Sequence, residues 1–402
     1  MVHDVAIVGG GIVGLAVGRE ILSRHPHLRL LVLEKEPTIA AHQTGHNSGV
    51  IHSGLYYAPG SMKARLCTEG RRALWRYCDE KQIEYRQVGK LIVATEEGER
   101  AALDALMQRG VANGIDGLVL LDGHGIERRE PHCRGIGAIF SPVTGIVDYG
   151  AVARSYGDDI REMGGSIQTG RRVLGIERRA GTTRIRTDAA DYEARNVIAC
   201  AGLMADRVAK MTGGGGDPKI VPFRGDYLIL KPEKRYLVRG NIYPVPDPAF
   251  PFLGVHFTPR MNGDVWLGPN AVLAFAREGY TLRTIDLRDL LESLTYAGFV
   301  KLAGRHMRAG MGELYRDIVP SAYVAALQRY IPELTVSDTL AGPSGVRAQA
   351  MRSDGTMLDD FAFEESDGVL HVRNAPSPAA TSSLAIAAYV ADDADRRFEL
   401  RR

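Results

Sequence analysis

The chain has 402 residues, of which 45% are hydrophobic and 24% are charged, and its formal net charge is +2. This composition is typical of a globular protein with two domains or one large intertwined unit, and the small net charge argues against a nucleic-acid-binding surface. The sequence contains no run of about 18 apolar residues, so no membrane-spanning helix is predicted. The four scattered cysteines lack the C-x-x-C spacing of redox and zinc sites.

A strand, a helix and a second strand are predicted in residues 4–34, DVAIVGGGIVGLAVGREILSRHPHLRLLVLE. Gly9, Gly11 and Gly14 form G-x-G-x-x-G at the helix start, where free N–H groups attract phosphates. Glu34 stands 20 residues after Gly14, the usual place of an acid that accepts hydrogen bonds from a ribose. The unit therefore predicts dinucleotide binding rather than a glycine-rich turn without a ligand. Because the first strand starts near residue 4, we expect no leader peptide and a cytoplasmic location.

The next segment, residues 41–54 (AHQTGHNSGVIHSG), is too polar for a core element and suits contacts to a cofactor. Beyond it we predict a helix from Ser61 to Lys81, a strand over Leu91–Ala94 and a helix over 97–110. A second unit of the nucleotide domain starts at Asp148, a good helix N-cap, and continues with strands at 172–177, 183–187 and 196–202.

The composition changes after Gly213–Gly216, which we interpret as a linker. One antiparallel sheet is predicted from segments rich in Pro, Tyr and Phe, namely Ile220–Lys231, Asn241–Pro246, Phe252–Thr258 and Asp264–Leu267. Two helices should follow, at 286–303 and 310–330. The tail returns to the first texture, with a strand over Val369–Arg373 and a helix from Ala379 to about Asp395.

These elements predict an α/β fold with two domains. A Rossmann-like dinucleotide-binding domain should be assembled from residues 1–84, 142–216 and 338–402, and a second α+β domain with an antiparallel sheet from residues 85–141 and 217–337. No second G-x-G-x-x-G follows a strand, so no nicotinamide domain is expected, and a flavin is a better prediction than NAD.

Several motifs in both predicted domains carry a resemblance to a known family: HQTGHNSGVIHSGLYY (42–57), PFRGDYLIL, YPVPDPAFPFLGVHFTPR, GPSGVRAQ and NAPSPAATSSLAIA. The chain resembles the L-2-hydroxyglutarate dehydrogenase/oxidase family, within the flavoproteins that resemble D-amino-acid oxidase and glycine oxidase. The resemblance implies bound FAD and oxidation of L-2-hydroxyglutarate to 2-oxoglutarate. It also implies electron transfer to a quinone, another acceptor or oxygen, and peripheral contact with a membrane, which would be the inner membrane.

The predicted FAD contacts come from the glycine turn, the acid after the second strand, the polar segment, the later strand ends and the start of the last helix. They are Gly9, Gly11, Ile12, Val13, Gly14, Glu34, Lys35, Gln43, Thr44, Asn47, Ser48, Gly49, Val50, Val173, Ala201, Gly202, Gly345, Arg347, Ala380, Thr381 and Ser382. No metal site is predicted.

The catalytic base is predicted to be a histidine, because a neutral imidazole titrates near working pH. His52 and His256 are the candidates, each with a structural role as the alternative. A dicarboxylate needs a guanidinium, for which Arg347 is the first choice and Arg224 the second. Tyr57, Tyr243 and Asn270 are predicted to orient the substrate.

Other functions stay open at this point. An amine or amino-acid oxidase like glycine oxidase, or an enzyme like glycerol-3-phosphate dehydrogenase, would use the same scaffold. A non-catalytic FAD protein is a further alternative, but a protein that only binds FAD has no need of a histidine in the second domain.

Overall fold

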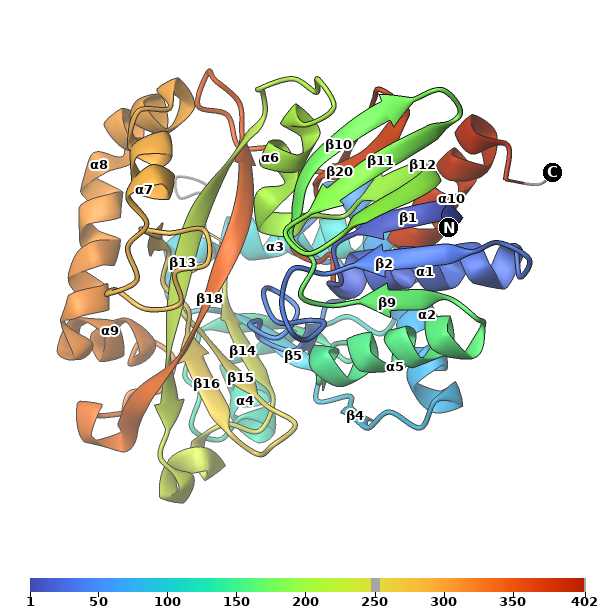
Figure 1. Cartoon of the computed structure of the whole chain (residues 1–402). Helices are drawn as coiled ribbons and strands as arrows, with labels where there is room; N and C mark the ends of the chain where they lie inside the picture. The colour runs from blue at the N-terminus through green and yellow to red at the C-terminus, as the bar shows by residue number, and fades with distance from the viewer. Residues whose placement is uncertain (247–253, 401–402) are drawn as a thin grey trace.

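The computed structural model describes residues 1–246 and 254–400, and two sheets dominate it, one on each side of Figure 1. The first sheet follows the order β10 (Val173–Arg179), β11 (Thr182–Thr187), β12 (Asp191–Ala199), β1 (Val2–Val8), β2 (Leu30–Leu33) and β9 (Ser166–Gln168). β20 (Val369–Asn374) pairs in parallel with β12, and β19 (Ala362–Ser366) pairs with β20. Five neighbouring strands, β9, β2, β1, β12 and β20, are parallel. β10 and β11 extend the sheet beyond β12 as an antiparallel hairpin.

Both faces of the first sheet are covered, which is why its strands are continuous apolar runs. Val5 and Ile7 of β1 face a core shared with four helices, whereas Ala6 and Val8 face the opposite side. The four helices are α1 (Ile12–Arg24), α2 (Met62–Glu80), α5 (Tyr149–Glu162) and α10 (Ser383–Phe398). On the opposite face lies α6 (Ala205–Lys210), which contributes Val208.

The second sheet is mainly antiparallel. Its order is β17 (Val272–Leu273), β13 (Lys219–Leu230), β16 (Val265–Gly268), β15 (His256–Pro259), β14 (Asn241–Pro244), β5 (Lys90–Ala94), β7 (Gly137–Ser141) and β6 (Val119–Asp122). β18 (Thr339–Met351) pairs along β13, and β5 with β14 is a parallel pair. Figure 1 shows β13 and β18 as two long neighbouring strands that lie beside the first sheet.

Strand alternation gives the second sheet two distinct faces. Leu91, Ile242 and Phe257 point to a core with α4 (Gly123–Arg129) and α9 (Pro320–Leu327). The intervening residues of the same three strands point to the other face, where α3 (Arg100–Ala112) packs at one end. A small third sheet consists of β3 (Val50–Ile51), β8 (Gly145–Val147) and β4 (Tyr85–Arg86).

The predicted α/β fold with a second antiparallel-sheet domain is confirmed, and most elements lie where the sequence placed them. Ser61 and Asp148 cap α2 and α5, accepting hydrogen bonds from Ala64 N and Gly150 N. The two helices predicted at 286–303 and 310–330 are wrong. The region instead holds α7 (Leu287–Leu294), α8 (Ala297–Ile318) and α9. The break between α8 and α9 lies at Pro320, which cannot continue a helix but can start one.

The predicted strand at 252–258 is described only in part, and the predicted domain boundaries stay untested. The start of the strand predicted at Phe252–Thr258 lies outside the described residues, and its described part forms β15. The domain boundaries stay a prediction, although β18, within the segment predicted for the first domain, pairs into the second sheet. No helix among residues 1–246 and 254–400 is long and apolar enough to cross a membrane.

Candidate functional site

The glycine turn between β1 and α1 has no room for side chains at two positions. Gly9 has a φ of +115°, and a Cβ there would lie 2.3 Å from the carbonyl oxygen of Cys200. A Cβ on Gly14 would lie 2.1 Å from the carbonyl oxygen of Gly9. By contrast, a Cβ on Gly11 would meet only the Thr44 hydroxyl, at 3.5 Å. The backbone at Gly11 is therefore open to a ligand, as predicted for the pyrophosphate position.

The start of α1 offers amide groups to an anion. Thr44 Oγ1 accepts from Ile12 N at 3.0 Å, and Gly11 caps the helix without a side-chain hydrogen bond. Within the described chain, the amides of Val13 and Gly14 have no protein acceptor. Glu34 lies at the end of β2, where its carboxylate accepts from Gly10 N at 2.7 Å and from Glu36 N at 2.9 Å. These bonds hold the predicted ribose-binding acid beside the glycine turn.

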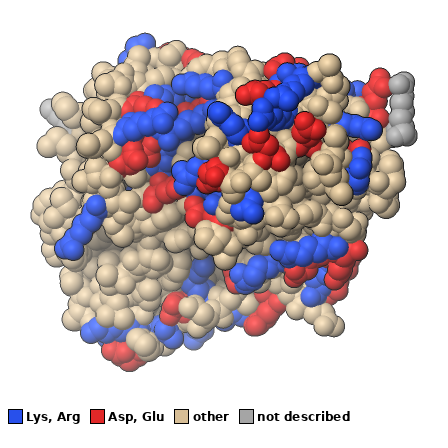
Figure 2. Space-filling view, in the orientation of Figure 1, with Lys and Arg blue, Asp and Glu red and all other residues tan. Residues whose placement is uncertain are grey.

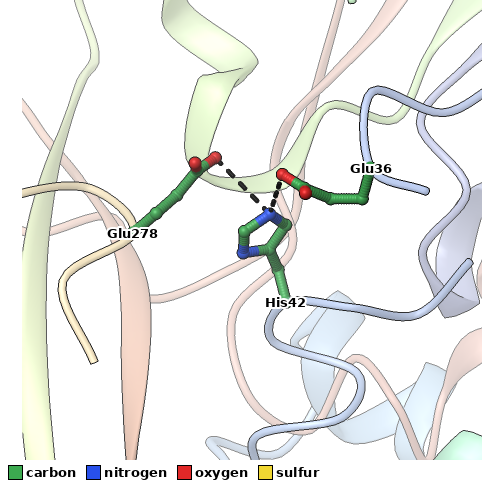
Figure 3. A group of neighbouring side chains, drawn as sticks. All are labelled: Glu36, His42 and Glu278. Carbon is green, nitrogen blue, oxygen red and sulfur yellow. Dashed lines mark hydrogen bonds and ion pairs between the residues drawn. The ribbon is translucent and has the colours of Figure 1, made fainter. Parts of the chain in front are cut away.

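Lys35 lies in a charged cluster rather than alone. Its ammonium is 2.6 Å from Glu278 Oε1 and 2.7 Å from His42 Nε2, and it also pairs with Glu36. Figure 3 shows His42 between the two acids, with Glu36 on one side and Glu278 on the other. Hydrogen bonds from Lys35 and His42 lower the pKa of Glu36 to about 2. Three of these groups could ligate a metal ion, but the Lys35 ammonium already lies among the acids.

The polar segment after β2 contacts both sheets. Gln43 Oε1 accepts from Ala348 N at 2.8 Å, and Asn47 bonds Gln43 O, Thr44 O and Gly49 N within the segment. A Cβ on Gly345 would lie 2.5 Å from His46 O, and one on Gly202 would lie 3.3 Å from Gln43 Nε2. The predicted contacts at 43–50, 201–202 and 345 thus lie together. Val173, at the start of β10, packs beside the core that β1 and β2 form on this side of the sheet.

The start of α10 meets the same segment. Thr381 Oγ1 accepts from His52 N at 3.1 Å and bonds the Tyr149 hydroxyl at 2.8 Å. Three buried polar atoms here have no partner, namely His52 Nδ1, Ser53 Oγ and Ser382 Oγ. Orphaned buried donors and acceptors are costly unless a ligand satisfies them. Together with the open backbone at Gly11 and the free amides of α1, they fit FAD.

The two predicted histidines are neighbours in the structure. The His256 ring is buried on β15 and stacks on Tyr243 of β14, with 4.0 Å between ring centroids. Burial, with the charges of Arg347 and Lys90, lowers the pKa of His256 to about 3. Burial and the charge of Lys90 lower the pKa of His52 well below its usual value, and His256 adds to that effect. Both imidazoles are therefore neutral at physiological pH.

Lys90 is a member of this site that the sequence analysis did not single out. It begins β5, and strand alternation points it to the same sheet face as Tyr243 and His256. Its ammonium lies 4.8 Å from the ring centroid of Tyr56 and 4.7 Å from that of Tyr243. The sequence did offer one signal: Lys90 directly precedes the apolar run Leu91–Ala94, so burial of that strand would also bury the lysine.

Arg347 and Tyr57 also lie near the histidines. Arg347 stands on β18 opposite Phe223, close enough for its charge to lower the pKa of His256. Lys63 Nζ lies 5.0 Å from the ring centroid of Tyr57 and pairs with Asp359 at 2.8 Å. The site therefore combines two neutral imidazoles, tyrosines and the cations Lys90 and Arg347.

Arg224 and Asn270, by contrast, belong to another cluster. The buried Arg224 guanidinium pairs with Asp226 and with Asp317, each at 2.9 Å. Asn270 accepts from Asp226 N and donates to Asp317. Because these contacts occupy both side chains, the structure does not bring them to the histidines as substrate ligands.

Comparison with known proteins agrees with this fold. The family model described as FAD dependent oxidoreductase (DAO) matches residues 4–393. The mitochondrial L-2-hydroxyglutarate dehydrogenases of Nematostella vectensis and Homo sapiens are 55% and 52% identical, over 99% of this chain and 91% and 89% of theirs. The L-2-hydroxyglutarate dehydrogenase of Indibacter alkaliphilus is 47% identical over 99% of this chain and 100% of its own.

Solved structures share the fold at low identity. An L-alpha-glycerophosphate oxidase from Mycoplasma pneumoniae with FAD bound has a TM-score of 0.80 at 22% identity, covering 99% of this chain and 95% of that one. Glycine oxidase from Bacillus cereus has a TM-score of 0.70 at 17% identity, covering 100% and 96%. The family match and the relatives show that this chain belongs to the L-2-hydroxyglutarate dehydrogenase family of FAD-dependent oxidoreductases.

Proposed function

We propose that this protein oxidises L-2-hydroxyglutarate to 2-oxoglutarate with FAD as cofactor. The observation that carries the proposal is the buried site in which two neutral imidazoles adjoin Lys90 and Arg347. A 2-hydroxy dicarboxylate needs a proton acceptor for its hydroxyl and cations for its carboxylates, and the site supplies both. The curated relatives named above bear the same activity in their names.

His256 is our choice for the base. Its Nδ1 lies 3.1 Å from Gly254 O, and since a carbonyl only accepts, Nδ1 carries the proton. Nε2 is then the free acceptor that can take the hydroxyl proton. His52 is the second candidate, because its buried Nδ1 has no protein partner and is available to a ligand. FAD, when bound, accepts the hydride that C2 releases.

The charge of the substrate is expected to change the pKa of the histidines. Burial and the nearby cations depress the imidazole pKa values in the free protein. A dianion placed beside Lys90 and Arg347 offsets their charge and raises those pKa values toward the working range of a general base. The histidines would thus become effective bases once the substrate is present.

The same charges disfavour the alternative of an amine or amino-acid oxidase. An ammonium substrate would meet Lys90 and Arg347, and like charges in a buried site repel strongly. A phosphorylated alcohol such as glycerol 3-phosphate would match the cations but carries only one anionic group. Two cations in one site favour the dicarboxylate.

Anaerobic addition of L-2-hydroxyglutarate to the purified yellow protein tests the function. We expect the visible flavin absorbance to bleach within seconds at millimolar substrate. Glycine, sarcosine and glycerol 3-phosphate at equal concentration are the comparison substrates. Faster bleaching by any of them than by L-2-hydroxyglutarate would refute the proposed substrate.

The electron acceptor, the location and membrane contact are further parts of the proposal. A quinone or oxygen would reoxidise the flavin, in a cytoplasmic protein that binds the inner membrane peripherally. The membrane contact is supported by exposed apolar side chains on two helices. Each of them is more than half exposed: Leu287 and Leu291 of α7, and Met307, Met311 and Ile318 of α8. Figure 2 shows few charged residues on the margin where Figure 1 places α8 and α9. The exposed cations Lys301 and Arg305 on α8 would suit anionic lipid headgroups.

Co-sedimentation with vesicles tests the membrane contact. We expect binding to phosphatidylglycerol vesicles, weaker binding to phosphatidylcholine vesicles, and loss of binding in the Met307→Glu/Met311→Glu variant. Leu174→Glu, on the exposed face of β10, is the matched control and should bind as the parent does. Equal sedimentation of all three proteins would contradict a lipid role for α8. The curated animal relatives carry the word mitochondrial in their names, so cell fractionation should accompany this test.

A further inference from the structure

Lys90 is a buried cation whose charge is not balanced by an ion pair within the described part of the chain. Only 1% of the residue is exposed. Within residues 1–246 and 254–400 no carboxylate lies at ion-pair distance from its ammonium. Three buried guanidinium groups have an acidic partner, namely Arg224 with Asp317, Arg277 with Asp206 and Arg373 with Glu364. Arg71 resembles Lys90 instead, since it is buried and forms no ion pair among the described residues.

The surroundings of Lys90 offset its charge only in part. The ring faces of Tyr56 and Tyr243 lie on it at 4.8 and 4.7 Å, and such faces attract a cation. Attraction by rings is weaker than hydration or pairing with a carboxylate, so an enclosed ammonium of this kind is destabilising for the protein alone. A site that retains it is preorganised for an anion.

The position of Lys90 connects this anion site with the chemistry. Its charge lowers the pKa of both His52 and His256, so the Lys90 ammonium lies close to both imidazole rings. The Tyr243 ring links the two groups, since it stacks on the His256 ring and also makes a cation–π contact with Lys90. An anion bound at Lys90 is therefore held next to the imidazoles that would take the substrate proton.

We propose that the Lys90 ammonium binds one carboxylate of the substrate directly, leaving the second carboxylate to Arg347. This inference rests on the function proposed above, and it adds a substrate-binding residue on β5 to those on β15 and β18. Each carboxylate then has one cation, and the bound substrate supplies the counter-charge that Lys90 lacks among the described residues.

The test measures binding of 2-oxoglutarate, the expected product, to the FAD-loaded full-length chain by isothermal titration calorimetry. Lys90→Met removes the charge but keeps an unbranched apolar side chain, and should weaken binding by about 30- to 300-fold, since the charge pair is desolvated. Lys90→Arg keeps the charge and should stay within about tenfold of the parent. Lys219→Met is the matched control: Lys219 also lies over a tyrosine ring, Tyr296, but it begins β13 and donates to Glu292 O, and its removal should not change binding.

Two other readouts separate a binding role from a structural one. Without ligand, Lys90→Met should unfold at the same or a higher temperature than the parent, because it no longer encloses a charge. With L-2-hydroxyglutarate, its KM should rise far more than its kcat falls, since the pair acts in ground and transition states alike. If the methionine variant does not fold, Lys90→Gln carries the same expectation.

The outcomes are distinguishable from failure of the proposed function. If Lys90→Met keeps its FAD and binds 2-oxoglutarate as the parent does, while the parent oxidises L-2-hydroxyglutarate, the Lys90 inference is wrong and the function stands. If the parent itself neither binds 2-oxoglutarate nor is reduced by L-2-hydroxyglutarate, the function is wrong and the inference falls with it.

Discussion

At the scale of single residues, the neighbours of His256, the proposed base, constrain both the position and the tautomer of its ring. Its stacking on Tyr243 holds the ring, and the bond from Nδ1 to Gly254 O determines the tautomer. Among the described residues, neither constraint acts on the His52 ring, although its backbone amide is bonded to Thr381. The difference predicts that the two histidines contribute unequally to catalysis.

We therefore predict that His256→Gln slows anaerobic flavin reduction at saturating L-2-hydroxyglutarate by about 10² to 10⁴, the usual contribution of a positioned base. His52→Gln should slow it less and raise KM instead. Stopped-flow absorbance measures both. Reduction of the His256→Gln protein at the parent rate would remove His256 from the base role, and a larger loss in His52→Gln would transfer that role to His52.

Lys90 should also affect stability as a function of pH. Burial lowers its pKa from 10.5 to about 8, so between these values the unfolded chain holds a proton that the folded chain has released. Stability rises with pH wherever the unfolded state binds more protons. The destabilisation by Lys90 is therefore full below pH 8 and declines as pH rises to 10.5, by about 3 kcal/mol in total.

The measurable quantity is the difference in free energy of unfolding between Lys90→Met and the parent at pH 7, 8, 9 and 10, obtained with urea. The difference should favour the variant at pH 7 and shrink with each step. Taking the difference removes most of the contribution of other titrating groups. Those facing Lys90 are His52, Tyr56, Cys67, Tyr243 and His256. A pH-independent difference would show that Lys90 does not titrate in this range.

At the scale of elements, the sequence predicted local units better than their partners. The β1–α1–β2 unit followed from periodicity and glycine spacing, because the elements that define it follow one another directly in the sequence. The pairing of β5 with β14 joins residues 90–93 to residues 241–244, and no local pattern indicates it. For that reason Lys90 was missed, while His256 and Tyr243, on adjacent strands, were found through their motifs.

Arg224 is a second residue whose role depends on contacts between distant elements. Asp226, two residues away on β13, was visible in the sequence as a partner on the same strand face. Asp317 comes from α8, whose position against the second sheet depends on tertiary packing. An arginine in a family motif was thus predicted to bind substrate, whereas the fold pairs it internally.

The glycine turn supports a prediction at this scale. Gly14→Ala would place Cβ 2.1 Å from Gly9 O, so α1 must move away from β1 and disturb the turn. We expect this variant to be purified with less than a tenth of the parent's FAD. Gly304→Ala, in α8 with open space around it, is the control and should keep its FAD with unchanged or slightly higher stability. Full FAD content in the Gly14→Ala protein would show that the turn tolerates the shift.

At the scale of the whole molecule, the site exists only where the two sheets meet. The first sheet supplies the glycine turn and, through the segment after β2, His52, whereas the second supplies Lys90, His256 and Arg347. The chain crosses between the sheets several times, and β18 runs along the second sheet before β20 returns to the first. Base, cations and cofactor site thus come from segments that are distant in sequence.

This division predicts strict stereochemistry. If one carboxylate binds Lys90 and the other Arg347, as proposed, the carbon chain of the substrate is held at both ends. Inverting C2 then exchanges its hydrogen and hydroxyl, so a D substrate cannot present its proton to the base and its hydride to the cofactor from the same pose. We expect D-2-hydroxyglutarate to reduce the flavin at least 10²-fold more slowly, because misplacement of the reacting atoms by about 1 Å already costs that much.

The comparison should be repeated in the Arg347→Ala variant, in which one end of the substrate is released. Its KM for the L enantiomer should rise, and the ratio between the enantiomers should fall toward unity, because the chain can then rotate about the remaining contact at Lys90. Anaerobic reduction followed at 450 nm with each enantiomer gives both numbers. An unchanged ratio in the variant would mean that contacts other than the two cations determine which hydrogen leaves.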